Sequence, residues 1–304
     1  MMSEKLSEVV YDDERKVRRK LLVRQGIIYG LLTAFAIFVI IPFYWMILTS
    51  LKDIETMAKV PPDLWLRPSE WEIRNYWLVI RGDVPYGRFM LNTVVVAAIS
   101  TVGTVLTTIL AAFAFSRLNF VGRDAFFFLL IATMMIPGEM FVITNFLTVS
   151  AAGWVADQNY LEAILAMTLP FMTSIFYIFF LRQTFKTVPN ELYYAAKVDG
   201  TSDFMYLWKI MVPIAKPTII TITILNAMGT WNAFIWPQLV TQFNETHRLV
   251  SNGLRGADYV DDAGRTMFNE QMAAAFFVTL PLLIVFLLLK KYIMRGVSRS
   301  GIKG

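Results

Sequence analysis

Few residues of this chain belong to the types that carry out catalysis, and they do not cluster in the sequence. The chain has one histidine, His247, and no cysteine. A nucleophile beside a base, or an HExxH helix, is the minimum for hydrolytic or metal chemistry, and neither pattern occurs. Asp258, Asp261 and Asp262 lack the twelve-residue loop and terminal glutamate of a known calcium site. We therefore predict no catalytic residue, no metal site and no enzyme activity.

One acidic residue, Glu139, lies inside a long apolar stretch, directly after Pro137 and Gly138. An ionisable side chain at that depth of a membrane costs several kcal/mol unless it faces water or a polar partner. Either Glu139 lines a translocation path or gate, or it is protonated or hydrogen-bonded to backbone groups that the break frees. The sequence leaves both interpretations open.

Six apolar stretches are the elements that would position these residues. Hydrophobic residues make up 56% and charged residues 17% of the 304 positions, which is too apolar for a soluble domain of this size. Each stretch is long enough to cross a hydrocarbon core of about 30 Å as a helix. We predict an all-α polytopic membrane protein with a 1–25 segment, a transmembrane domain over 26–289 and a 290–304 tail. The six predicted spans are 26–51, 89–116, 125–149, 163–181, 217–241 and 271–289.

The 28 Lys and Arg residues set the predicted orientation. Most of them fall before the first span, after every second span and in the tail, so both termini are expected in the cytoplasm. Because they gather at membrane edges and not in one groove, we expect lipid headgroups, not nucleic acid, as their partner.

Polar residues inside the spans are candidates for the translocation pathway. Asn92 begins the second span, and the fifth span carries Asn226, Trp231 and Asn232. Amides within a span need partners, and a tryptophan beside asparagines offers stacking and hydrogen bonds to a sugar. The alternative is simple helix–helix contact. We count these four residues and Glu139 as the candidate pathway.

Residues 188–217 carry the densest helix signals outside the spans. Gly200 can end a helix in the left-handed conformation, and Thr201 or Ser202 can cap the next helix. Pro213 then ends or kinks that second helix. The spacing predicts two short helices joined by a sharp bend. On spacing alone, an ordinary amphipathic loop helix at the membrane interface is an alternative.

This run resembles the EAA loop of permeases in ABC importers, in which an acid and two alanines precede a glycine, with an isoleucine and a proline further on. Tyr194 stands where the family has its acid. The resemblance implies a type I ABC importer permease fold, in which this loop is a coupling helix that docks on the ATP-hydrolysing subunit. The residues at matching positions are Ala195, Ala196, Asp199, Gly200, Ile210 and Pro213, with Glu191 upstream.

The tail resembles the same family, in which similar tails reach between the ATPase subunits. The resemblance covers 26–304, and it points to the carbohydrate branch and to the six-span member of a permease pair. The matching tail residues are Gly296, Gly301, Lys303 and Gly304.

The resemblance implies an importer in a prokaryotic cell membrane. Its other parts would be a second permease, two ATPase subunits that bind ATP and Mg, and an external solute-binding protein. The chain has no phosphate-binding glycine loop, so ATP hydrolysis is expected on a separate subunit and no cofactor on this one. The expected cargo is a sugar or oligosaccharide. Glycerol phosphate or another small polar solute is an alternative, and a membrane scaffold without transport is the alternative from a different class.

Overall fold

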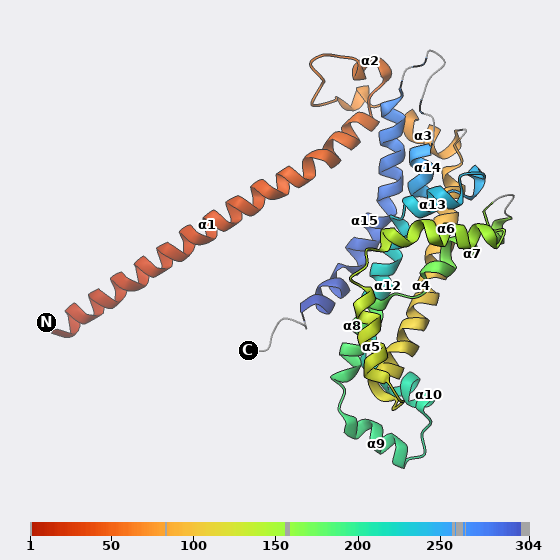
Figure 1. Cartoon of the computed structure of the whole chain (residues 1–304). Helices are drawn as coiled ribbons and strands as arrows, with labels where there is room; N and C mark the ends of the chain where they lie inside the picture. Colours follow the sequence, from red (N-terminus) through yellow and green to blue (C-terminus); the bar gives the residue numbers. More distant parts are fainter. Residues whose placement is uncertain are drawn as a thin grey trace.

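The computed structural model describes residues 2–82, 84–155, 159–256, 259, 264 and 266–298, with side chains described except at 2–17, 256 and 291–298. This part of the chain is helical and has no β-strand, which confirms the all-α prediction. The helices form an elongated bundle, and one long helix leaves it at an angle (Figure 1).

The centre of the bundle is α4 (Tyr86–Arg117). Ala97, Ser100, Thr104 and Ala112 are buried along it, because small side chains let neighbouring backbones approach closely. It packs chiefly against α8 (Ile175–Lys186) and α12 (Lys216–Trp231). The second predicted span therefore lies inside the bundle.

The first helix, α1 (Met2–Ser50), is continuous through the predicted boundary at residues 25 and 26. Its side chains are exposed from residue 18 until the last turn, where it packs on α15 (Phe268–Ser298). A helix that is apolar all round and exposed to this extent needs lipid or another protein around it. Figure 1 shows it leaving the bundle at an angle.

Three of the predicted spans are broken. The helix pair α5 (Arg123–Thr133) and α6 (Val142–Ala151) bends by 90° across a break at residues 134–137, and α7 (Tyr160–Thr168) meets α8 at 54°. An 81° bend precedes α12. Three unbroken helices and three bent pairs are long and apolar enough for six membrane crossings. The 81° bend lies before the fifth predicted span. The fifth span is the third broken one, because α12 ends at Trp231 and α13 (Ile235–Val240) follows.

Side chains of α4 satisfy backbone groups that the break between α7 and α8 leaves open. Thr104 donates to the Phe171 carbonyl at 3.3 Å, and Thr107 donates to the Met172 carbonyl at 2.5 Å. Backbone groups within a membrane must find partners inside the protein, so these threonines make the broken span tolerable.

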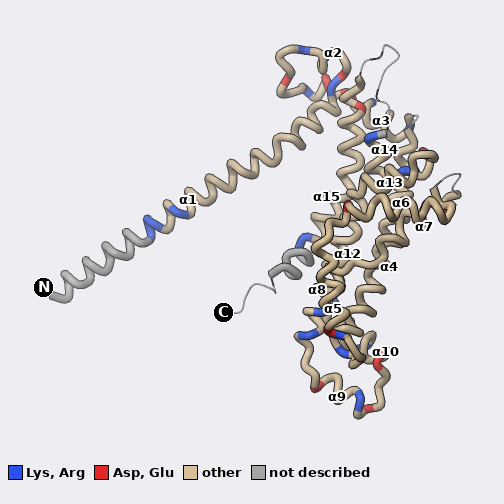
Figure 2. Tube along the Cα trace, in the orientation of Figure 1, with Lys and Arg blue, Asp and Glu red and all other residues tan. Residues whose placement is uncertain are grey.

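At one end of the bundle, α2 (Ile54–Met57), α3 (Arg74–Arg81) and α14 (Val250–Gly256) form a cap. Buried Asn75 donates to the carbonyls of Ser50 and Lys52, both at 2.9 Å, and Asn269 reaches the same Lys52 carbonyl at 3.2 Å. These bonds tie α1, α3 and α15 together. Charged residues lie mostly at this α2 end and at the opposite end, with few between them (Figure 2).

Candidate functional site

The predicted pair of short helices occupies the end of the bundle opposite α2 (Figure 1). They are α9 (Asn190–Val198) and α10 (Asp203–Tyr206), and α10 continues through a π-helical turn, Leu207–Met211, into α11 (Val212–Ile214). Two helices and a bend are thus present where the spacing predicts them. We call residues 188–217 the coupling loop.

The bend is a Schellman motif centred on Gly200, whose φ is +73°. The Thr201 N–H donates to the Ala196 carbonyl at 2.9 Å, and the Gly200 N–H donates to the Lys197 carbonyl at 3.0 Å. A residue with a side chain is disfavoured at this φ, so glycine is the residue that fits here. Of the two candidates, Ser202 is the cap of α10, because its hydroxyl accepts the Met205 N–H at 3.3 Å.

A polar contact braces the bend on one side. The Asp203 carboxylate accepts the Tyr193 hydroxyl at 2.7 Å and pairs with the Lys197 ammonium at 2.8 Å. These contacts lower the pKa of Asp203, with Lys197 the larger cause, and they raise the pKa of Lys197. The Tyr193 pKa is raised first by burial and then by Asp203. The three groups thus join α9 to α10.

The face of the coupling loop that meets the bundle is apolar. Ala196 is buried with Tyr206, Leu207 and Met211 in one core cluster, and half-buried Ile210 packs against that cluster. The rings of Tyr193 and Tyr206 meet edge to face at 5.1 Å. The loop is therefore packed onto the bundle and does not hang from it.

The opposite face of the coupling loop is exposed and also partly apolar. Tyr194 is 63% exposed, Val198 88% and Phe204 68%. Exposed apolar side chains grouped at one end of a molecule indicate a contact surface. Of the residues that the family motif selects, Glu191, Ala195, Asp199, Gly200 and Pro213 are exposed as well. The two motif alanines thus divide between the two faces, with Ala195 outward and Ala196 inward.

Residues of the predicted tail fall mostly outside the described residues. Gly296 lies in the last turns of α15, whereas Gly301, Lys303 and Gly304 lie outside them, as do Asp258, Asp261 and Asp262. No group of His, Asp and Glu within the described residues could hold a metal ion.

The structure does not gather the candidate pathway residues in one place. Asn92 is buried, and its amide donates to the carbonyls of Thr246 and Arg248, both at 3.0 Å. Trp231 packs in a different core cluster, beside α15. Asn232 is exposed, and its amide donates back to the Met228 carbonyl at 2.8 Å.

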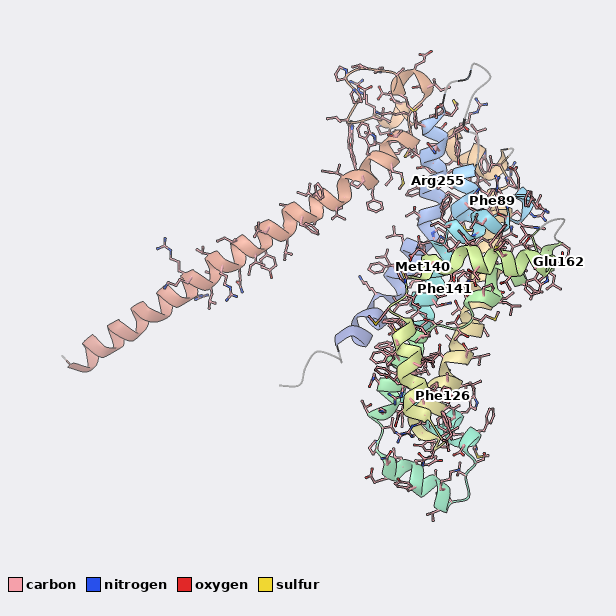
Figure 3. The ribbon with its side chains drawn as sticks, in the orientation of Figure 1. Phe89, Phe126, Met140, Phe141, Glu162 and Arg255 are labelled. Carbon is pink, nitrogen blue, oxygen red and sulfur yellow. The ribbon has the colours of Figure 1, made fainter. Side chains whose placement is uncertain are left out.

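Glu139 is exposed at the break between α5 and α6. Its carbonyl accepts the Val142 N–H, but its carboxylate forms no hydrogen bond or ion pair with the residues that the structure describes. The Glu139 carboxylate is thus not hydrogen-bonded to the backbone groups that the break frees. Met140 and Phe141 lie beside it at the same break (Figure 3), and both are exposed.

Asn226 differs from these residues because it opens onto a cavity. Its amide donates to the Thr101 hydroxyl at 3.1 Å, and it lines a cavity of about 250 Å³ inside the bundle. Aromatic and uncharged polar groups surround this space, and none of its lining residues is charged. Besides Asn226, the lining includes Ser100, Phe171, Tyr177, Thr230 and Trp236.

Two arginines under the coupling loop were not selected by sequence reasoning. Arg117 ends α4 and Arg182 lies in α8, and both are buried. Their positions at the end of an apolar stretch are the ordinary place for a topology-setting charge, so nothing in the sequence marks them as contacts between helices.

Comparison with known proteins identifies the family of this chain. The family model described as "Binding-protein-dependent transport system inner membrane component" matches residues 103–299, most of the chain. The chain belongs to this family. The permease is 29% identical over 277 residues to the "Probable ABC transporter permease protein MG189" of Mycoplasma genitalium. This match covers 89% of this chain and 86% of that protein. It is 30% identical over 265 residues to the "sn-glycerol-3-phosphate transport system permease protein UgpE" of Yersinia pestis, with 86% and 92% covered.

A solved structure has the same fold. It is titled "Crystal structure of a bacterial ABC transporter involved in the import of the acidic polysaccharide alginate", and one of its chains matches with a TM-score of 0.75. The match covers 88% of this permease and 95% of that chain at 23% sequence identity. The predictions of an ABC importer permease subunit and of its fold are thereby confirmed.

Proposed function

We propose that this permease forms half of the translocation pathway of an ATP-driven importer and that its coupling loop docks on an ATPase subunit. The observation that carries the proposal is the exposed face of that loop. It presents Tyr194, Val198 and Phe204 around a braced, glycine-dependent bend. A rigid apolar projection of this kind has the properties of a docking element. Membership in a family of importer permeases favours it over a scaffold without transport.

Both termini and the coupling loop face the cytoplasm in this proposal, in a prokaryotic cell membrane. The separation of charged ends in Figure 2 supports a membrane position between them. Because the chain has no cysteine, a single introduced cysteine is the one thiol of this chain that a maleimide can label. Lys197→Cys should react with an impermeant maleimide only in inside-out vesicles, and Val60→Cys only in whole cells. The reverse pattern would overturn the orientation.

A second permease is the proposed partner along α1 and the break between α5 and α6. Both regions expose apolar side chains to the outside of this chain. An external binding protein would deliver cargo at the α2 end. The tail, through Gly296, Gly301, Lys303 and Gly304, is proposed to contact the ATPase subunits, which carry ATP and Mg.

The proposed cargo is a sugar. Phe171 and Trp236 supply flat apolar surfaces and Asn226 an amide around a cavity with no charged lining residue, which suits a neutral polyol better than an anion. Glycerol phosphate is the second candidate, because a relative is a glycerol phosphate permease. Transport of maltose and of glycerol 3-phosphate by the purified complex would distinguish them. Asn226→Leu should reduce sugar uptake, and uptake that is unchanged would contradict the proposed role of this cavity.

The docking proposal is tested by photocrosslinking. A benzophenone amino acid at Tyr194 should crosslink to a co-purified ATPase subunit, and the same probe at exposed Trp65 of the α2 end should not. Recovery of the permease without any ATPase, or an adduct from both positions, would contradict the proposal.

A further inference from the structure

The last turns of α4 and α8 are joined by two arginines, each of which donates hydrogen bonds to carbonyl groups of the other helix end. Arg117 of α4 donates to the Phe185 carbonyl at 2.8 Å and also to the Val188 carbonyl, just beyond the C-terminus of α8. Arg182 of α8 donates to the Phe115 carbonyl of α4 at 3.0 Å. Each helix therefore supplies the cation that caps the carbonyl end of the other. Carbonyl groups at a helix C-terminus favour a positive charge.

Both side chains are buried, with Arg117 8% exposed and Arg182 5%. Buried guanidinium groups are stable only where acceptors surround them. Arg182 also lies over the Phe127 ring at 3.7 Å and pairs with Asp124 of α5 at 3.5 Å. The two helices are thus fixed to one another by directional bonds, not only by packing.

Two contacts with the coupling loop distinguish the two arginines. One is the bond from Arg117 to the carbonyl of Val188, the first residue of that loop, and the other reaches α9. Arg117 also donates to the side-chain oxygen of Asn190, the first residue of α9. No such bond joins Arg182 to the coupling loop. One guanidinium therefore holds the end of α4, the end of α8 and the start of the coupling helix.

The same α4 helix holds the opposite end of the molecule. Asn92 binds the carbonyls of Thr246 and Arg248, and the Thr93 hydroxyl accepts the Val250 N–H at 2.9 Å. With 32 residues at about 1.5 Å each, α4 spans roughly 48 Å. Its ends are thus bonded to the coupling loop and to the 246–250 segment.

We infer that Arg117 is a positioning residue that transmits displacement of α9 into α4, so that motion of the coupling loop reaches the 246–250 segment. Arg182 stabilises the α4–α8 pair without a direct part in this transmission. The inference rests on the proposed docking of the coupling loop. It adds the residue through which that docking acts on the bundle.

The test uses the full transporter in proteoliposomes and needs no knowledge of the cargo. A cysteine at exposed Gln242, beside the 246–250 segment, reports the far end of α4 through its rate of labelling by an impermeant maleimide. The rate is measured with and without trapping by Mg-ATP and vanadate. Arg117→Gln and Asn190→Ala should each reduce the trapping-induced change at least about fivefold while vanadate-sensitive hydrolysis continues.

Arg182→Gln is the matched control. It should lower the thermal midpoint of the complex but leave the labelling change within about twofold of the unsubstituted protein, since it breaks no contact with α9. Asn190→Asp keeps an acceptor for Arg117 and should restore the change. If the Arg117→Gln complex does not assemble, the labelling change in Asn190→Ala tests the role of Arg117. Residue 190 is exposed, so its truncation leaves no cavity in the core.

A full labelling change in Asn190→Ala would overturn the role of Arg117, as would an equal reduction in Arg182→Gln. A complex with no change on trapping even in the unsubstituted protein would count against ATPase docking itself. The two failures are therefore separable.

Discussion

Substitution of Gly200 separates the shape of the coupling loop from its contact with another subunit. Gly200 has φ +73°, and a Cβ built on it meets nothing within 4 Å. A Cβ therefore fits at this exposed position of the isolated permease, and the remaining cost is that of a left-handed backbone, about 1–2 kcal/mol. This backbone cost should be similar for alanine and tryptophan, because it comes from the contact of Cβ with the following carbonyl oxygen and both residues have a Cβ.

Gly200→Ala and Gly200→Trp should therefore lower the thermal stability of the loop equally, within about 0.5 kcal/mol. Gly200→Asn, which tolerates the left-handed region, should cost less. In uptake assays the alanine variant should lose at most about thirtyfold, the equivalent of roughly 2 kcal/mol. The tryptophan variant should lose more than about a hundredfold, because its indole occupies the docking surface of the partner.

The assay compares uptake with ATP hydrolysis in the same proteoliposomes, after the amount of permease in the membrane has been matched. Gly200→Trp should hydrolyse ATP without uptake. If alanine and tryptophan reduce uptake to the same extent, the effect is one of backbone strain alone and Gly200 does not contact the ATPase.

Three further outcomes follow from local geometry. Gly253→Ala should destabilise the permease by about 1–3 kcal/mol, since its Cβ would lie 2.3 Å from the ring of Phe89, which Figure 3 labels. Gly229→Ala is the matched control, because a Cβ there meets nothing within 4 Å. Equal thermal midpoints of the two variants would contradict this prediction. Burial, and secondarily Arg88, lowers the pKa of His247, so the folded state takes up this proton less readily and stability should fall as pH drops below about 6.5. His247→Gln should flatten that pH dependence between pH 5 and 7 in thermal unfolding. Asp203→Asn removes the ion pair that braces the coupling loop and should reduce uptake more at low salt than at high salt, whereas a salt-independent loss would argue against the electrostatic brace.

The elements that sequence reasoning recovered are those with a local cause. Gly200 takes the left-handed conformation because the chain must turn at once after α9, and Ser202 caps α10 through its own backbone neighbours. The break before Gly138 likewise follows from Pro137, which has no N–H and clashes with the preceding turn. Each of these features depends on residues within about four positions, which a single sequence displays.

Contacts between distant residues were not predictable in the same way. Asn92 and Trp231 were assigned to the pathway because polar side chains in a span need partners. The structure gives Asn92 carbonyl partners more than 150 positions away and packs Trp231 beside α15. A need for a partner is visible in the sequence, but the identity of the partner depends on helix packing.

The two arginines show why this limit bears on function. An arginine at the end of an apolar stretch fixes topology in most membrane proteins, and by type and position Arg117 and Arg182 are equivalent. Their difference arises only when α4 and α8 lie side by side with their C-termini together, since Asn190 then comes within reach of one guanidinium and not the other. A docking motif can be read along the chain, whereas the residue that connects it to the bundle is determined by which helix ends meet. Coupling in this permease is therefore expected to be sensitive at positions that no local motif marks.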